Sequence, residues 1–406
     1  MTTENEQKGK PVDIVRRHWL AASAAGAAAG LSGFSPPSLA QAQPKPLPPV
    51  ATFKRASGVI VHSANGIETR RAAFGSSGIT DADLLFLRNN IAAPNAAIVE
   101  NPDAWKIEID GVTSPTALTV ADLKRMGVTS VAMVLQCSGN GRGFFKHKAS
   151  GSQWTVGAAG NALWSGVPVR DVVAALGGVR EGMRYMTSTG GETLPPGVDA
   201  RGIVVERSVP WNAMEGAILA WELNGAPLPL AHGAPLRLII PGYYGVNNIK
   251  YVKRLAFTVD ETQANIQKSG YRVREIGKKG DPTQPSMWEM NLKSFVTHPS
   301  EAGETLRAGL VQVRGVAFSG GSPVTGVEIS VDGGKTWQAA EFFGPHMGRY
   351  AWRQFVAQVN LPAGKYAITS RAIAADGSTQ PELRVENERG YAHNGWRDHA
   401  VSVTVT

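Results

Sequence analysis

The pattern of hydrophobic and polar positions divides the chain near residue 286. Before that point the period changes from segment to segment. Trp105–Val112 alternates as a strand does, and Thr119–Met126 has the spacing of a helix capped by Thr119. After it, alternating apolar segments are separated by Gly, Pro and Asp turns, as in 311–342. Short strands in such a regular series predict an antiparallel β-sandwich of the immunoglobulin type.

Three further segments complete the prediction for the first part of the chain. Val131–Cys137 and Pro235–Gly242 are continuous apolar runs, typical of buried strands, and Val167–Gly178 has the pattern of a helix with glycine just past its end. We therefore predict an α+β fold with two domains, each long enough to bury its own core. A mixed α/β domain covers residues 43–285, beginning with a proline-rich leader, and an immunoglobulin-like β-sandwich covers 286–406.

The N-terminal residues have the features of an export signal. Arg16 and Arg17 precede an Ala/Gly-rich apolar stretch that ends near Leu31, and an Ala-Gln-Ala site follows at 40–42. These features predict a twin-arginine signal peptide over 1–42, which carries folded proteins to the bacterial periplasm. The apolar stretch is too short and too rich in alanine to span a bilayer, so we expect no membrane span. The alternative is a weak amphipathic arm.

Composition excludes several classes of function. The chain of 406 residues has one cysteine, which excludes an internal disulfide framework and any cysteine-rich zinc or iron–sulfur site. No C-x-x-C-H sequence is present, so we expect no c-type haem on this chain. The net charge is +8 at pH 7, without a dense Lys/Arg run that would indicate nucleic acid. Such a surface favours an anionic substrate or an acidic partner, or it serves only solubility.

The single cysteine, Cys137, lies where a buried run breaks into the glycine-rich basic loop "QCSGNGRGFFKHK". A small core residue, a catalytic thiol with His147 as base, a redox sensor and a metal-binding thiolate are all open for it. The flanking residues favour the metal ligand. Glycines let the backbone approach a ligand closely, and cationic side chains stabilise a thiolate and bind anions. A soft metal carried by an anionic cofactor fits this set.

Several motifs in order resemble those of the sulfite oxidase family. "QCSGNGR" (Gln136–Arg142) is similar to its C-x-G-N-R-R molybdenum-cysteine motif, and "FLRNN" (Phe86–Asn90) to its F-x-R-N-H pterin motif. Trp154–Val173 resembles the stretch that follows the cysteine loop, and Leu219–Val252 resembles the segment that holds the pterin phosphate. Near the C-terminus, "SVDGGKTW" and "ENERGYAHNGWRDHAV" resemble the family's immunoglobulin-like dimerisation domain.

The resemblance implies a molybdenum–molybdopterin cofactor, with the metal bound to one pterin dithiolene and to the thiolate of Cys137. It therefore implies that the domain over 43–285 binds molybdopterin. Carried over position by position, the cofactor-binding residues are Arg88, Asn90, Cys137, Ser208, His232, Arg237 and Lys250. Two positions depart from the family motifs: Asn90 replaces a histidine, and Gly141 replaces the first arginine of the C-x-G-N-R-R pair.

The resemblance also implies a substrate pocket that binds a sulfur oxyanion. Its residues are Arg88, Arg142, Trp154, Tyr271 and Arg389, and the catalytic set is Cys137, Tyr271, Arg142 and Arg88. The residue types suit this chemistry. Guanidinium groups give bidentate, charge-assisted hydrogen bonds to an oxyanion, and a tyrosine hydroxyl can orient substrate or transfer a proton.

From the resemblance we expect a periplasmic molybdenum enzyme that oxidises sulfite to sulfate and passes electrons singly to a separate c-type cytochrome. It would form a homodimer or a heterotetramer with a cytochrome subunit. One alternative is the molybdenum subunit of a sulfane dehydrogenase in thiosulfate oxidation. A reductase acting on sulfoxides is another. An alternative of a different class is a catalytically silent secreted binding protein.

Overall fold

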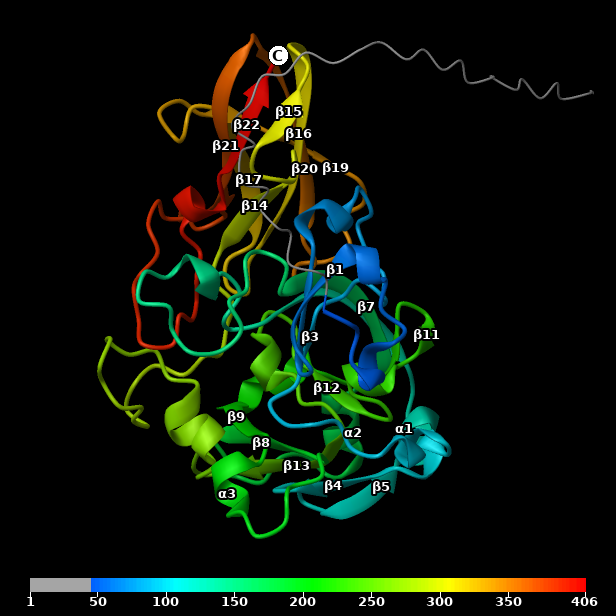
Figure 1. Ribbon diagram of the computed structural model, residues 1–406. Coiled ribbons are helices and arrows are strands. Elements are labelled where there is room, and N and C mark those ends of the chain that lie inside the picture. Colours follow the sequence, from blue (N-terminus) through cyan, green and yellow to red (C-terminus); the bar gives the residue numbers. More distant parts are fainter. Residues whose placement is uncertain (1–44) are drawn as a thin grey trace, which may run out of the picture. The chain divides into compact units, whose positions relative to one another are not determined.

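The computed structural model describes residues 45–406, and the predicted signal peptide over 1–42 lies outside them (Figure 1). Pro44–Thr406 forms one unit in which a mixed first part packs against strands of the C-terminal part. The predicted α+β class is confirmed. Within residues 45–406, no helix is both long enough and apolar enough to cross a bilayer.

Two sheets build most of the first part. The first sheet has the strand order β11-β10-β7-β6, with β12 paired to β10. Its strands are β6 (Thr129–Gln136), β7 (Ala159–Pro168), β10 (Ile218–Leu223), β11 (Ala226–Pro227) and β12 (Arg237–Ile239). The second sheet has the order β5-β4-β13-β8-β9, in which only β4 and β13 run parallel. Its strands are β4 (Lys106–Asp110), β5 (Thr116–Thr119), β8 (Tyr185–Gly190), β9 (Glu206–Pro210) and β13 (Val252–Thr258).

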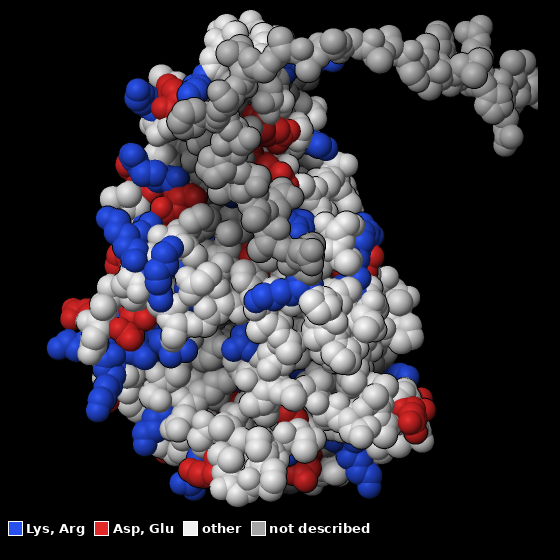
Figure 2. All heavy atoms as spheres, in the orientation of Figure 1, with Lys and Arg blue, Asp and Glu red and all other residues white. Residues whose placement is uncertain are grey.

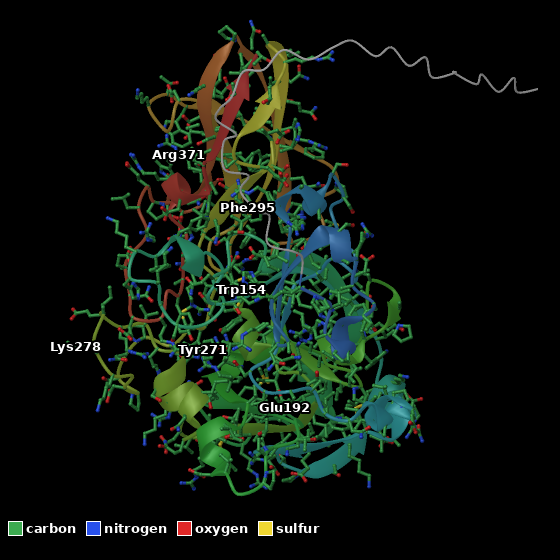
Figure 3. All side chains as sticks on the ribbon, in the orientation of Figure 1. Trp154, Glu192, Tyr271, Lys278, Phe295 and Arg371 are labelled. Atoms are coloured by element: carbon green, nitrogen blue, oxygen red, sulfur yellow. The ribbon has the colours of Figure 1, made fainter. Side chains whose placement is uncertain are left out.

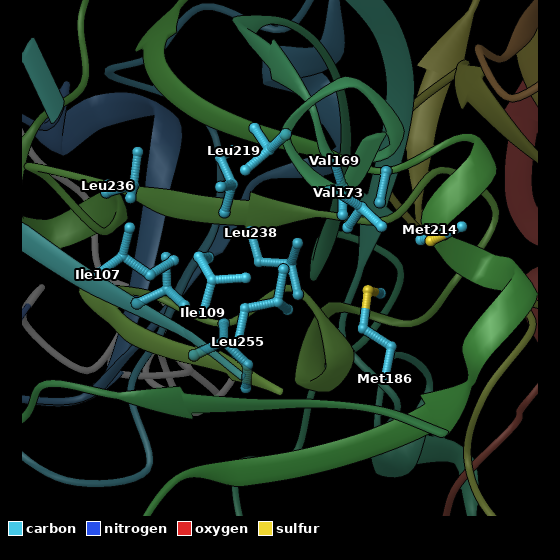
Figure 4. Close-up of a cluster of buried hydrophobic side chains, with 14 of the residues drawn as sticks. Ile107, Ile109, Val169, Val173, Met186, Met214, Leu219, Leu236, Leu238 and Leu255 are labelled. Carbon is cyan, nitrogen blue, oxygen red and sulfur yellow. The ribbon is translucent and has the colours of Figure 1, made fainter. Parts of the chain in front are cut away.

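The two sheets and the short helix α2 (Val169–Ala175) share one apolar core. Leu219 and Leu238 enter it from the first sheet, and Ile109 and Leu255 from the second (Figure 4). All four side chains are fully buried. This core fixes the strand ends that carry the loops of the candidate site.

The three α-helices within residues 45–406 are short. They are α1 (Val120–Arg125), α2 and α3 (Ala200–Ile203). Thr119 caps α1 as predicted, in a capping box with Asp122 whose two hydrogen bonds measure 2.8 and 3.1 Å. The helix predicted from Val167 begins two residues later, because Val167 and Pro168 still pair with β10. A smaller sheet joins β1 (Val59–Ser63), β2 (Gly66–Thr69) and β3 (Leu87–Arg88).

The C-terminal strands form two facing sheets. One has the order β14-β16-β20-β19 and the other β15-β22-β21-β17-β18. The strands are β14 (Lys293–His298), β15 (Glu304–Leu306), β16 (Gly309–Phe318), β17 (Val324–Ser330), β18 (Gln338–Ala339), β19 (Glu341–Phe343), β20 (Arg353–Leu361), β21 (Gly364–Ala374) and β22 (Val401–Val405). Val313 and Phe355 from one sheet meet Ile368 and Val403 from the other in a common core. This is the predicted β-sandwich.

Candidate active site

A cavity opens at the end of β6, and Cys137 lines it. Cys137 directly follows the strand, and its N–H donates to Ala158 O at 2.9 Å. Asn140 holds the loop that follows. Its Nδ2 donates to Gln136 Oε1 at 3.1 Å, and its Oδ1 accepts from Ala158 N at 3.0 Å. The cysteine loop is therefore fixed by neighbours on both sides, with its thiol at the cavity.

Three cationic or potentially cationic residues of one short segment line the same cavity: His232, Arg237 and Lys250. We call them the basic end. Arg237 donates from Nη1 to His232 O at 2.8 Å, and its guanidinium lies 5.0 Å from the ring centroid of Trp164. Lys250 Nζ donates to Asn89 Oδ1 and to Ala231 O, both at 2.6 Å. The hydrogen-bond acceptors of these two groups are neutral oxygens, and Glu192 is the one acidic residue among those that line the cavity.

Burial makes the positive charge of the basic end costly. It lowers the pKa of Arg237 to about 9 and sets the pKa values of Lys250 and His232 well below their usual range, with further lowering of both from the neighbouring cations. A bound anion with several oxygens would reverse these shifts, because it supplies the missing countercharge. The basic end therefore suits a phosphate group.

Two ionisable residues near the basic end were not predicted from the sequence. Lys54 Nζ donates to Leu85 O at 2.5 Å and lies 2.8 Å from His232 Nε2, and burial lowers its pKa to about 7. Nothing in the proline-rich leader marks Lys54 as a site residue. Glu192 lines the cavity from a loop after β8, and burial raises its pKa to about 7 (Figure 3). Its setting in "GGET" gave no signal either.

Three of the ten buried side-chain polar atoms without a partner in residues 45–406 belong to residues of this cavity. Asn89 Nδ2, Ser138 Oγ and Glu192 Oε2 belong to lining residues and make no hydrogen bond there. Such orphaned atoms are rare in folded proteins and need an explanation. A polar, anionic ligand that reaches from the basic end to Cys137 would satisfy them. A molybdopterin, with its phosphate, its ring heteroatoms and its soft metal, fits this donor set.

Tyr271 and Asn90 close another side of the cavity, and Arg88 lines it as well. The Tyr271 hydroxyl donates to Asn90 Oδ1 at 3.2 Å, so the residue that replaces the family's histidine here serves as an acceptor for the tyrosine. Burial and the neighbouring Tyr391 raise the pKa of Tyr271. The phenol therefore stays protonated and acts as a hydrogen-bond donor.

Four of the predicted site residues do not line the cavity. Arg142 donates from Nε to Arg389 O at 2.9 Å and from Nη1 to Ser152 O at 3.1 Å. Arg389 Nε and Trp154 Nε1 are buried and have no hydrogen-bond partner among the described residues. Trp154 packs in the same apolar cluster as Cys137. Ser208 lies on β9, where its hydroxyl meets Thr187 Oγ1 at 2.7 Å and accepts from Thr262 N at 2.9 Å. Its hydrogen bonds are thus already used within the second sheet.

The structure explains why glycine replaces the first arginine of the family's C-x-G-N-R-R motif at position 141. Its φ is +96°, a conformation that favours glycine, and a Cβ there would lie 2.4 Å from Cγ of His393. His393 is buried, its Nε2 lies 2.9 Å from Asp398 Oδ2, and burial lowers its pKa to about 4. A histidine ring from the C-terminal part therefore takes the space that a larger residue at 141 would need.

Comparisons with known proteins agree with this site. Residues 93–266 match the family described as "Oxidoreductase molybdopterin binding domain", and residues 284–405 match the "Mo-co oxidoreductase dimerisation domain". Mitochondrial sulfite oxidase of Macaca fascicularis is 31% identical over 344 residues, which cover 80% of this chain and 62% of that protein. Sulfite oxidase of Gallus gallus is 31% identical over 340 residues, covering 78% and 72%. The chain thus spans less than two thirds of the length of the macaque protein.

A solved structure gives the same picture. The sulfane dehydrogenase SoxCD from Paracoccus pantotrophus has a TM-score of 0.66 with 26% sequence identity. The match covers 84% of this chain and 86% of that one, so it includes both the site and the sandwich.

Proposed function

Because the chain belongs to the sulfite oxidase family of molybdopterin-binding oxidoreductases, we propose that it oxidises sulfite to sulfate and passes the electrons singly to a separate c-type cytochrome. One observation carries the proposal. A single cavity brings Cys137 together with the basic end and with Arg88 and Tyr271, so that a metal–pterin ligand and an oxyanion would meet at the thiol.

At the cofactor, Cys137 would be the protein's ligand to molybdenum, and His232, Arg237 and Lys250 would hold the pterin phosphate. Molybdenum in this setting supplies two-electron oxygen-atom transfer and single-electron release. Lys54 supports His232, since its Nζ lies 2.8 Å from the imidazole Nε2. Asn89 and Glu192 would provide the remaining polar contacts.

At the substrate, Arg88 and Tyr271 would bind sulfite oxygens from the cavity wall. A guanidinium provides fixed donors for an oxyanion, and the protonated phenol adds one more. Arg142 and Arg389 lie near Tyr391, which stacks on Tyr271, and they add positive charge. Lys and Arg side chains also gather on the side of the molecule where the loop of Lys278 lies (Figure 2). This charge would steer an anionic substrate or an acidic electron acceptor to the site.

A second candidate function rests on the likeness to SoxCD. A sulfane dehydrogenase would act on a protein-bound sulfane and would need a wider entrance than sulfite requires. Steady-state oxidation of sulfite and of thiosulfate, with cytochrome c as acceptor, separates the two. We expect sulfite to reduce cytochrome c and thiosulfate not to; inactivity with sulfite, together with oxidation of a sulfane bound to a carrier protein, would favour the second candidate. Sulfoxide reduction without sulfite oxidation would favour a reductase.

A catalytically silent binding protein predicts a different result in a simpler measurement. The purified protein should contain molybdenum close to one atom per chain if the proposal holds, and none if it is a binding module. Residues 16–31 support export to the periplasm, and cell fractionation after replacement of both Arg16 and Arg17 by lysine tests it. The dimerisation family match supports a homodimer or a complex with a cytochrome subunit, which sedimentation would resolve.

A further inference from the structure

The ring of Tyr391 lies flat on the ring of Tyr271. Their centroids are 5.1 Å apart and the planes differ by only 6°. Tyr271 directly follows the helical turn Ile266–Gly270, whereas Tyr391 comes from the C-terminal part and is 2% exposed. Stacked aromatic pairs gain energy beyond their buried area and hold both rings in place.

Hydrogen bonds hold the backbone around Tyr391 in place. Tyr391 N–H donates to Asn387 Oδ1 at 2.9 Å, and Asn387 Nδ2 donates back to Tyr391 O at 2.9 Å. The residues on either side, Gly390 and Ala392, have φ values of +59° and +58°. A left-handed alanine persists only where its surroundings enforce it. Here Ala392 N–H donates to Ser138 O of the cysteine loop at 3.0 Å.

Two arginines lie near the same ring. The guanidinium carbons of Arg142 and Arg389 are 5.4 and 5.9 Å from the Tyr391 centroid, and that of Arg207 is 5.7 Å from the Tyr271 centroid. Cations within this distance are attracted to an aromatic face, more strongly in a buried setting. Tyr391 therefore contacts or neighbours three residues of the proposed substrate set: Tyr271, Arg142 and Arg389. We call Tyr271 and Tyr391, with these two arginines, the aromatic end.

We propose that Tyr391 is a positioning residue for Tyr271, supplied by the C-terminal part. It fixes the angle at which the Tyr271 hydroxyl faces the cavity, and it acts through that ring rather than by touching sulfite. The inference rests on the proposed function, since it assigns Tyr271 to the substrate. Sequence analysis gave no role to Tyr391, because only the fold brings residues 271 and 391 together.

Two substitutions at position 391 separate stacking from volume. Tyr391→Leu removes the flat ring, and Tyr391→Phe keeps it. We expect Tyr391→Leu to raise the sulfite KM by about 3- to 30-fold, which corresponds to roughly 0.7–2 kcal/mol of ring contacts at 1.4 kcal/mol per tenfold. Tyr391→Phe, which keeps the ring, should have the wild-type KM. Phe355→Leu, in the sandwich core, is the matched control: it should lower the melting temperature and leave KM unchanged.

A double-mutant cycle tests whether the effect passes through Tyr271. Tyr391→Leu should cost less in a Tyr271→Phe background than in the wild type, since the hydroxyl that it positions is already missing. A wild-type KM in Tyr391→Leu, or full additivity with Tyr271→Phe, would overturn the proposal. Should Tyr391→Leu fail to fold, Tyr391→Met is a second variant without a flat ring.

Sulfate binding keeps this test independent of turnover. Calorimetric titration of the purified protein with sulfate should show weaker binding for Tyr391→Leu and unchanged binding for Tyr391→Phe. If the three proteins bind sulfate as expected but the wild type does not oxidise sulfite, the proposed function is wrong and the positioning role stands. If sulfite is oxidised but the sulfate affinity is the same in the wild type and in Tyr391→Leu, the positioning role is wrong and the proposed function stands.

Discussion

The basic end and the aromatic end of the site are assembled in opposite ways. The basic end comes from one stretch of chain, in which the bond from Arg237 to His232 spans 5 positions and that from Lys250 to Ala231 spans 19. At the aromatic end, the bond from Arg142 to Arg389 spans 247 positions. The three residues of the basic end therefore come from the segment between β11 and β13, with support from Lys54 and Asn89, whereas the aromatic end needs the C-terminal part to pack against it.

This difference predicts separate consequences for mutation. Changes at the basic end should alter cofactor content and leave the apparent affinity for sulfite untouched in the loaded fraction. Changes at the aromatic end should alter sulfite affinity and leave cofactor content untouched. Cys137 belongs to both, because it lies in the cavity between them.

The largest effect is expected at that shared position. Cys137→Ser replaces a soft thiolate with a hard hydroxyl of similar size, so the electronic structure of the metal changes while the core volume does not. We expect sulfite turnover to fall by more than about 100-fold, the upper end for loss of an outer-shell contact to a metal site. The melting temperature should stay near that of the wild type. Wild-type turnover would remove Cys137 from the site.

Lys250→Met tests whether the basic end controls cofactor content. Loss of a charge-assisted bond costs about 1.5–3 kcal/mol, or about 10- to 150-fold in affinity, so molybdenum per chain should fall markedly. The sulfite KM of the loaded fraction should not change. Lys253→Met, which replaces an exposed lysine at the start of β13, is the control. A raised KM with full molybdenum content would place Lys250 at the substrate and break the comparison.

Arg389→Ala tests the other end, with an effect of about tenfold or more on the sulfite KM for loss of one charge-assisted bond. Its buried Nε has no partner among the described residues, and its backbone oxygen, which holds Arg142, survives the substitution. Molybdenum content should stay at the wild-type level. Arg397→Ala removes an exposed arginine paired with Glu382 and should change neither quantity. A normal KM in Arg389→Ala would limit the aromatic end to the tyrosines and Arg142.

The smallest effect concerns Glu192 and pH. Burial raises the pKa of its carboxyl from 4.5 to about 7, so between these values the folded protein binds a proton that the unfolded chain has lost. This contribution to stability is present below pH 4.5 and disappears as the pH rises through 7. Glu192→Gln should therefore gain melting temperature relative to the wild type from pH 4.5 to 7, by about 1–2 °C for each kcal/mol relieved. Parallel pH curves would show that the cavity does not penalise the carboxylate.

The same difference explains which features of the fold and the site could be predicted from the sequence. The local elements were accessible: the Thr119 cap and the buried strand before Cys137 follow from residue patterns, and the basic end lies in one recognisable segment. Cys137, Arg88, Asn90 and Tyr271 line one cavity with it, as the motifs led us to expect.

The contributions that depend on packing between distant segments were not accessible. Lys54 reaches His232 across 178 positions, and Tyr391 meets Tyr271 only in the folded protein. Gly141 departs from the family motif, and only the fold shows that His393 fills the space beside it. No periodicity or motif records such contacts, because each depends on where a second segment packs.

The central claim is that Cys137 binds the metal of a molybdopterin, and X-ray absorption at the molybdenum edge tests it most directly. Wild-type protein and the Cys137→Ser variant would be compared at matched molybdenum content. The wild-type spectrum should contain one more sulfur neighbour than that of the variant, at a metal–thiolate distance. Identical sulfur shells in the two proteins would contradict the assignment, because the metal would then be bound without the single cysteine of the chain.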